Sequence, residues 1–155
     1  MPGKLQKEIR QTRAIRLLEE EASLNIVRTA DLLMTGLMAV LKPHGLSATQ
    51  YNVLRILRGA GAAGVTCKDI GKRMLTPDPD ITRLMDRLEN RGLLTRDRAK
   101  EDRRFVTMRL TPAGLDMVNQ LDRPIEQMHR KQMKHMSTAR LRQLVGLLEE
   151  VRAGG

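Results

Sequence analysis

Apolar residues recur at helical spacing over the first third of the chain. From Glu19 to Leu41 they lie three or four positions apart, and further apolar residues widen the surface beyond one stripe. A helix that is apolar on more than one side needs more than one packing partner. The basic, weakly patterned residues 4–18 before it predict a short helix or an arm. The KPHG at residues 42–45 ends the long helix.

Shorter helices are predicted next, and each has a recognisable start. The capping residues that mark them are Ser47 with Gln50, then Thr66, then Asp78 followed by Pro79. The predicted helices cover residues 48–58, 67–75 and 79–91. The GAGAAG at residues 59–64 predicts a flexible turn, and Gly92 ends the third of these helices.

Two segments, Leu93–Arg98 and Phe105–Leu110, alternate with a period of two and predict the strands of a hairpin. Val106, Met108 and Leu110 would share its inner side. A loop of arginines and acids joins the two strands. After the hairpin the chain returns to helix. Thr111 caps a predicted helix that begins at Pro112 and runs to about residue 135, and Ser137 caps a last helix.

Composition and charge narrow the class of protein. The chain has 155 residues, 41% of them hydrophobic, which suits one domain with its own core. A net charge of +10 and a pI near 10.6 attract polyanions. Tyr51 and Phe105 are the only aromatic residues, whereas binders of RNA and single strands stack bases on aromatic side chains. The positive charge and the scarcity of aromatic residues together favour duplex DNA as the partner.

Several classes of protein are disfavoured by what the sequence lacks. No apolar run is expected to reach the roughly 20 residues of a membrane span, and the polar start does not look like a secretory signal. A single cysteine, Cys67, fits a reducing cytoplasm. No zinc-ligand spacing and no set of nucleophile, base and orienting group is present. We therefore predict no metal, no cofactor and no enzymatic activity.

The helix 67–75 followed by the helix 79–91 predicts a helix-turn-helix, and the hairpin after it makes the motif winged. The face of the second helix opposite the core carries the side chains that could enter a major groove: Arg83, Asp86, Arg87 and Asn90. The hairpin tip could reach a minor groove, with Arg104 inserted and Asp102 orienting it. Arg98 lies where it could pair with an acid across the hairpin. The alternative is a solvated hairpin with incidental ion pairs.

Two stretches carry a resemblance to a known family: ITRLMDRLENRGLLTR, residues 81–96, and EDRRFVTMRLTPAG, residues 101–114. Together with the upstream LSATQYNVLRIL, they resemble the winged-helix domain of the MarR family of bacterial transcription regulators. The resemblance implies a winged helix-turn-helix domain at 46–111, flanked by dimerisation helices at 1–45 and 112–155. It further implies a cytoplasmic homodimer that binds a palindromic operator, and a repressor released by a small-molecule effector.

The family's functional positions fall on residues of this chain. Its wing arginine and aspartate correspond to Arg104 and Asp102, and its recognition-helix TR corresponds to Thr82 and Arg83. The full predicted DNA-binding set is Thr66, Lys68, Pro79, Asp80, Thr82, Arg83, Arg87, Arg98, Asp102, Arg103 and Arg104. Many members have Ser or Thr where this chain has Pro79 and Asp80. Asp80 repels phosphate; it could accept a hydrogen bond from cytosine, or serve as a partner of the helix dipole, the reading we favour.

Three further interpretations stay open at this point. The protein could be a non-specific architectural DNA-binding protein. Cys67 could be a redox-sensing thiol, although a partly buried structural cysteine is the favoured reading. Methionines at helical spacing usually fill a core. They could instead form a soft-metal site with nearby histidines, and the residues concerned are His44, His129, His135, Met128, Met133 and Met136. An effector pocket would lie between the dimerisation helices and the winged domain, and the scarcity of aromatics argues against a stacking-type pocket.

Overall fold

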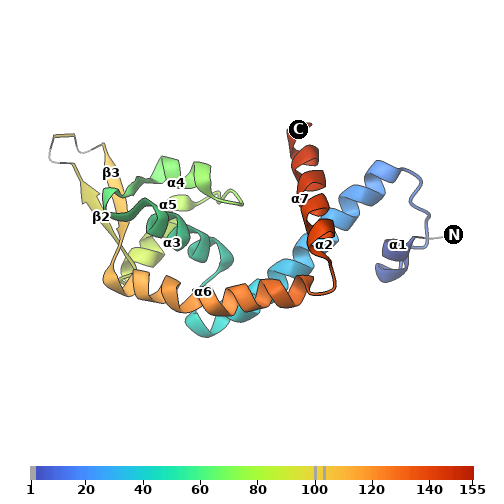
Figure 1. The fold of residues 1–155 in the computed structure, drawn as a ribbon. Coiled ribbons are helices and arrows are strands. Elements are labelled where there is room, and N and C mark those ends of the chain that lie inside the picture. The colour runs from blue at the N-terminus through green and yellow to red at the C-terminus, as the bar shows by residue number, and fades with distance from the viewer. Residues whose placement is uncertain (1–2, 100, 103) are drawn as a thin grey trace.

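The computed structural model describes residues 3–99, 101–102 and 104–155, and the chain is mainly helical with one small antiparallel sheet (Figure 1). The elements are α1 (Lys4–Glu8), α2 (Leu18–Leu41), η1 (Lys42–His44), α3 (Ala48–Ala60), η2 (Gly61–Ala63), β1 (Val65–Thr66), α4 (Cys67–Arg73), α5 (Ile81–Asn90), β2 (Leu94–Arg98), β3 (Val106–Leu110), α6 (Pro112–Met133) and α7 (Thr138–Ala153). The predicted fold class, mainly helical with a winged helix-turn-helix, is confirmed.

The predicted hairpin forms, and a third strand joins it. Strands β2 and β3 pair in register from Leu94 opposite Leu110 to Arg98 opposite Val106. The strand β1 was not predicted; it pairs with the other edge of β3, so the strand order is β1-β3-β2. The strand was missed because its two residues are too few to show the period-two alternation by which strands are predicted. Gly64 precedes β1 with a φ of 70°, and a Cβ there would lie 2.9 Å from the carbonyl oxygen of Met108.

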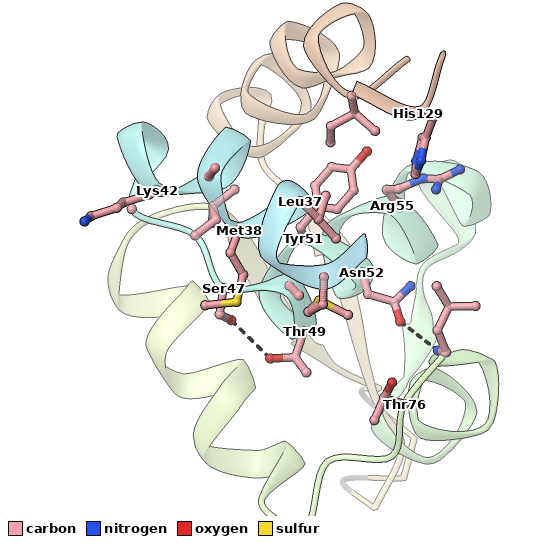
Figure 2. Close-up of a pocket in the computed structure, with 17 residues that line it drawn as sticks. Leu37, Met38, Lys42, Ser47, Thr49, Tyr51, Asn52, Arg55, Thr76 and His129 are labelled. Carbon is pink, nitrogen blue, oxygen red and sulfur yellow. Dashed lines mark hydrogen bonds between the residues drawn. The ribbon is translucent and has the colours of Figure 1, made fainter. Parts of the chain in front are cut away.

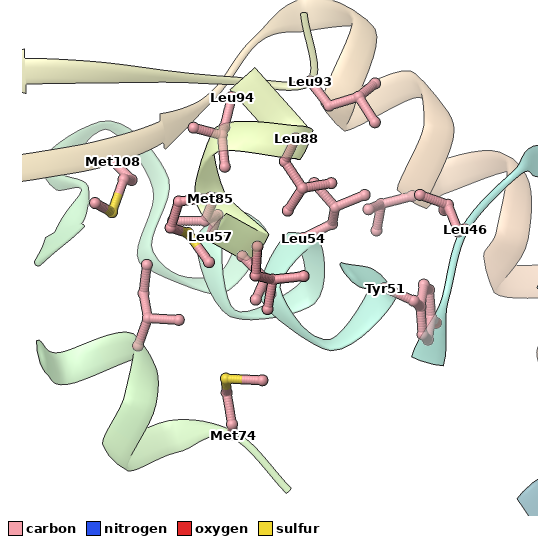
Figure 3. Close-up of a cluster of buried hydrophobic side chains, with 14 of the residues drawn as sticks. Leu46, Tyr51, Leu54, Leu57, Met74, Met85, Leu88, Leu93, Leu94 and Met108 are labelled. Carbon is pink, nitrogen blue, oxygen red and sulfur yellow. The ribbon is translucent and has the colours of Figure 1, made fainter. Parts of the chain in front are cut away.

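The core lies between α3, α4, α5, the hairpin and the first half of α6 (Figure 3). Its fully buried side chains include Leu54 and Leu57 from α3, and Met85 and Leu88 from α5. At 25 cal/mol per Å², burying each such side chain contributes about 1.5–3 kcal/mol. The buried cluster extends only from residue 41 to residue 125. The winged part of the chain therefore holds the core, and the outer helices contribute little to it.

Helices α2 and α7 carry most of the exposed apolar residues. Helix α7 and the first part of α2 lie at the end of the molecule opposite the hairpin, while the last part of α2 packs against α3 and α6 (Figure 1). In α7 no described residue is buried, and in α2 only Leu41 is. Their large exposed hydrophobic residues are Leu18, Ile26, Val27, Leu32, Met34 and Met38 in α2, and Val145, Leu147 and Val151 in α7. A surface this apolar marks an interaction site.

The expectation that no apolar run suits a membrane span is wrong for the segment containing α2. The continuous helical segment Leu18–His44 has 27 residues. Its most apolar stretch of 18 residues has a mean hydropathy of 1.4, and only 6% of that stretch is buried. By length and composition alone it could cross a bilayer. The prediction failed because Arg28 and Asp31 interrupt the apolar run, whereas mean hydropathy averages over them. A helix that packs against partners on several sides has the same composition.

Most predicted helix starts are confirmed at the level of the cap. Ser47 forms both hydrogen bonds of the capping box with Gln50, and Thr66, Thr111 and Ser137 each accept a backbone N–H with the side chain. The start of α5 was placed two residues too early. The Asp78 carboxylate accepts the N–H of Asp80 at 2.8 Å in a turn, which delays the helix.

The GAGAAG segment is more ordered than predicted. Helix α3 continues through Gly59 to Ala60, and residues 61–63 add a turn of 3-10 helix. Local sequence suggested a break because glycine disfavours helix. The helix continues past Gly59 because Ala60, the next residue, packs against the core cluster.

We predict opposite effects on stability for two glycine-to-alanine substitutions. A Cβ on Gly114 would collide with the backbone carbonyl of Leu93, which cannot move aside, so Gly114→Ala should lower the free energy of unfolding by about 1–3 kcal/mol. Gly59 lies in α3 with no atom within 4 Å of a built Cβ, so Gly59→Ala should raise it by about 0.5–1 kcal/mol. Urea unfolding checks both. A destabilising Gly59→Ala would contradict the helical assignment of this residue.

Candidate nucleic-acid interface and adjoining pocket

Helix α5 presents one apolar face to the core and one polar face to solvent. Leu84, Met85 and Leu88 are buried, and the helix has no other buried residue among those described. Thr82, Arg83, Arg87 and Asn90 are exposed, as predicted. An α-helix fits the major groove, and the arginine fork can bond the guanine edge. The exposed face is thus chemically suited to reading duplex DNA.

Asp80 has a structural role at the start of α5. Its carboxylate accepts the N–H of Arg83 at 3.2 Å, and its other oxygen lies 3.5 Å from the Nε of the same arginine. Pro79, predicted to be the first helical residue, lies exposed outside the helix. A capping aspartate also complements the positive end of the helix dipole. Asp80 therefore fixes α5 and restrains Arg83, which matches the reading favoured over cytosine recognition.

Asp86 contacts Arg96, although the sequence placed this aspartate among the DNA-facing residues. Arg96 from β2 donates to the Asp86 carboxylate at 2.5 Å and to the Thr82 carbonyl at 3.4 Å. It also lies 3.9 Å from the carboxylate of Glu89. The arginine thereby joins the first wing strand to the recognition helix. Sequence alone missed this pair because its two residues lie on different elements.

The wing tip holds Arg104 out into solvent. The Asp102 carboxylate accepts the backbone N–H of Arg104 at 3.0 Å and lies 3.7 Å from its Nε, while the arginine side chain is 92% exposed. Asp102 therefore fixes the backbone more closely than it fixes the guanidinium. Arg98 is exposed, and its predicted ion pair does not occur among the described residues. Instead Arg109 reaches Asp97 across the hairpin at 3.5 Å. The predicted contact residue Arg103 lies outside the described residues.

The remaining predicted contacts lie at the start of α4. Lys68 is exposed in the first turn. Thr66 is half-buried, and its hydroxyl accepts the N–H of Asp69 at 3.2 Å. Cys67, next to it, packs against the core, and burial raises the pKa of its thiol more than the nearby charge of Arg96 lowers it. The thiolate is the reactive form, so this environment disfavours a redox role.

A pocket of about 790 Å³ lies where α2, α3 and α6 meet (Figure 2). This is the region between the long outer helices and the winged lobe. Its walls are mainly apolar and come from each of the three helices, with Leu37 and Met38 from α2, Tyr51 from α3 and Ile125 from α6. A pocket of this size and lining suits a small organic molecule.

Two of the polar residues that line the pocket, Arg55 and His129, lie near each other at one side of it (Figure 2). The guanidinium carbon of Arg55 lies 5.9 Å from the ring centre of Tyr51. Burial raises the pKa of Tyr51, so its hydroxyl stays a hydrogen-bond donor at neutral pH. One of the two aromatic residues of the chain, Tyr51, lines the pocket, and the expectation that the pocket is not of a stacking type stays a prediction. Composition counts residues and cannot show where they lie.

The pocket also includes part of the loop between α4 and α5. Leu75 and Thr76 line it, and the N–H of Leu75 donates to the Asn52 side chain at 2.8 Å (Figure 2). The Leu75 side chain is 88% exposed. The loop leads directly to α5, which carries the exposed Arg83 and Arg87. A molecule in the pocket would therefore contact both the outer helix α2 and the approach to α5.

An ion pair fastens α3 to α6 beside the pocket. Arg58 donates to both carboxylate oxygens of Asp122, at 2.8 and 2.9 Å, and to Asn119 at 3.0 Å. Bidentate pairs of this kind are among the stronger hydrogen-bonded contacts. The hydrogen bond from Arg58 holds the pKa of Asp122 below its ordinary value, with a smaller contribution from the charge of Arg55. These hydrogen bonds therefore fix the position of α3, which belongs to the winged lobe, against α6.

Within the described residues, no three His, Cys, Asp or Glu side chains are placed to hold a metal ion. Met128 packs against the core, and His129 lines the pocket.

Known proteins with similar sequence and structure belong to one family. The sequence model described as the MarR family matches residues 44–104. The multiple antibiotic resistance protein MarR of Salmonella typhimurium is 30% identical over 112 residues, 72% of this chain and 76% of that protein. The homoprotocatechuate degradative operon repressor of Escherichia coli is 25% identical over 138 residues, 89% of this chain and 92% of that protein. The crystal structure of a MarR transcription factor from Planctomyces limnophilus is 39% identical, with a TM-score of 0.67, covering 88% of this chain and 98% of that one.

The Arg58–Asp122 pair predicts a pH-dependent contribution to stability. Because the folded pKa of Asp122 is lowered, the pair stabilises the fold above the unfolded value, about 3.9, and this contribution is lost as pH falls through the folded value. Asp122→Asn should therefore be less stable than wild type at pH 7, and the difference should shrink below about pH 4. Urea unfolding across this range checks it, with Asp116→Asn in the same helix as control. A difference that stays constant with pH would contradict the assignment.

Proposed function

The chain belongs to the MarR family of winged-helix transcription regulators, and on that premise we propose that it is a dimeric repressor, released from a palindromic operator by a small-molecule effector. It would occlude a promoter in the cytoplasm. No catalytic role is part of the proposal.

The observation that carries DNA binding is the pairing of exposed arginines with aspartates on two separate elements. Arg83 on α5 is restrained by Asp80, and Arg104 on the wing by Asp102. Each aspartate accepts the backbone N–H of its arginine, so the arginine extends from a fixed backbone position, which a flexible basic arm would not provide. Arg83 would read a major groove, and Arg104 an adjacent minor groove. The set Thr66, Lys68, Thr82, Arg87 and Arg98 would add backbone or base contacts around these two.

The exposed apolar surface of α2 and α7 supports a homodimer. A second copy would cover this surface and place two recognition helices on one face of a duplex, which a two-fold symmetric operator requires. A membrane is the other apolar environment that could cover α2. Arg28 and Asp31 lie near the middle of that helix, where each charge costs about 2.5–3.5 kcal/mol in a bilayer. A partner chain leaves such charges at the edge of the interface and is the occupant we propose.

The pocket between α2, α3 and α6 would bind the effector. Its apolar walls suit an aromatic ring, and Arg55 with His129 suits a carboxylate at one end. The named function of one relative, repression of a homoprotocatechuate degradative operon, supports an aromatic acid as effector class. Because the pocket includes Leu75 and Thr76, a bound molecule would favour one position of the loop before α5. A ligand shifts such an equilibrium only by binding the two states with different affinity.

A non-specific architectural protein remains the second candidate because of the net charge of +10. Its binding would depend steeply on salt and little on sequence. Asp80 caps α5, and a hydrogen bond to Asp102 holds the backbone of Arg104. Both features favour specific recognition, because binding by net charge alone requires neither of them.

We predict that Arg104→Ala weakens specific DNA binding with little change in stability. The side chain is 92% exposed, so folding should not depend on it, while loss of one groove contact should cost about 1–3 kcal/mol of binding free energy. The probe is the duplex that the wild-type protein selects from a random-sequence library, and titration by fluorescence anisotropy measures Kd. Arg142→Ala on α7 is the matched control. Wild-type affinity of Arg104→Ala would show that the wing arginine is wrongly assigned.

We predict that Arg55 selects for the carboxylate of an effector. Homoprotocatechuate is the probe, and binding to the folded state should raise the unfolding temperature of the wild-type protein. Arg55→Ala should reduce the affinity by about tenfold or more, because a charge-assisted hydrogen bond is lost. Arg123→Ala on α6 should have no such effect. Equal affinity of Arg55→Ala and wild type would mean that the carboxylate does not bind here, and no binding by wild type would refute this effector class.

A further inference from the structure

One large apolar side chain is exposed on the wing. Within the described part of segment 46–111, the large hydrophobic residues that are exposed are Leu75 and Phe105. Leu75 lines the pocket, so its exposure has a local explanation. Phe105 lines no described pocket and is 60% exposed, although it is one of only two aromatic residues in the chain. Phe105 therefore lies outside the core, on the wing beside the exposed Arg104.

The backbone of Phe105 is held in place by two hydrogen bonds. Its carbonyl accepts the N–H of Ala99 at 3.1 Å, and its own N–H donates to the carbonyl of Asp102 at 3.1 Å. The first of these extends the β2–β3 ladder one step beyond the last pair, Arg98 with Val106. Ala99 is therefore the residue opposite Phe105, and its methyl group is too small to cover the ring. The aromatic side chain is fixed at its base and left uncovered by its cross-strand neighbour.

The strand geometry directs Phe105 away from the core. Successive side chains of a strand point to opposite faces, and Met108 is buried while Val106 is half-buried on the inner face. Phe105 immediately precedes Val106 and so belongs to the outer face, with Thr107 and Arg109. A protein core cannot be the partner of a ring on this face.

The charges around Phe105 indicate a polyanion as the partner. Arg98 and Arg104 are exposed on either side of the hairpin tip. The acids close to the tip are Asp97, which pairs with Arg109, Asp102, which pairs with Arg104, and Glu101, which is exposed. Residues 97–109 carry five basic and three acidic side chains, a net charge of +2. An apolar ring beside arginines suits the minor groove of duplex DNA, where phosphates line both edges and apolar side chains can insert between stacked base pairs.

We propose that Phe105 enters the minor groove beside Arg104 and acts as an apolar wedge at a base step. This inference rests on the proposed function as a DNA-binding regulator. A wedge separates two stacked base pairs in part, and the separation costs least at the flexible steps TA and CA/TG. The ring would thereby add a preference for such a step at the wing position, without any hydrogen bond to a base. Arg104 would read the width of the groove, and Phe105 its deformability.

The test compares Phe105→Ala and Phe105→Leu with wild type on the duplex that the wild-type protein selects from a random-sequence library. Phe105→Ala should weaken binding on the order of tenfold, and Phe105→Leu, which keeps an apolar wedge, should lose less. The slope of log affinity against log salt should stay unchanged for both, because no phosphate contact is removed. Arg104→Ala provides the contrast, because it removes a positive charge from between the phosphates of the groove and its slope should therefore fall. Leu115→Ala, which removes an exposed apolar side chain from α6, should bind like wild type.

A second readout reports on the base step itself. With 2-aminopurine placed at successive positions of the wing site, wild type should raise its fluorescence at one step, and Phe105→Ala should not. Unchanged affinity of Phe105→Ala, or an affinity loss matched by a fall in its unfolding temperature, would overturn the wedge while leaving the proposed function intact. Failure of the wild-type protein to select any duplex would instead overturn the proposed function, and the wedge with it.

Discussion

The apolar surface of α2 is the constraint on which the rest of the molecule depends. Most of the 24 residues of α2 are exposed in a single chain, including six large apolar side chains, and α7 adds apolar surface without burying any of its own described residues. Covering this surface with a second copy would unite two winged lobes in one symmetric body. Because the small core lies between residues 41 and 125, each lobe keeps its own shape while the outer helices determine its position. The distance between the two recognition helices would then be a property of the outer helices and of their joint with the lobe.

That joint is where the pocket lies. On one side α3 is fastened to α6 by Arg58 and Asp122, and along the same pair of helices Arg55, Tyr51 and His129 face an open apolar space. A molecule bound there would contact α2 and the loop before α5 together. The arrangement offers a physical route from a small ligand to the spacing of the DNA-facing helices. It requires no change within the core, which is closely packed and resists deformation.

Features encoded by neighbouring residues could be predicted from the sequence, whereas features made by distant contacts could not. The capping box of Ser47, the alternation in β3 and the glycine after α5 each depend on residues a few positions apart. The strand β1 has two residues and exists only because β3 lies beside it. The pairing of Asp86 with Arg96 joins two elements, so an aspartate on a polar helix face looked available for DNA. The start of α5 was misplaced because Asp78 and Asp80 are both good caps, and only the turn between them shows which one is used. The arginines proposed on α5 and the wing were predicted from the polar helix face and the charged hairpin loop, and the family resemblance assigned Arg83 and Arg104 independently. The pocket residues come from three helices and have no local signature.

The measurement that tests the central claim most directly is affinity selection of genomic DNA fragments by the purified protein at physiological salt, followed by sequencing. We expect a palindrome whose half-sites lie about one helical turn apart, because two recognition helices in a two-fold dimer would contact successive major grooves on one face of the duplex. Fragments that share no motif would contradict a sequence-specific dimer and would leave the basic charge of the chain as the source of its DNA binding.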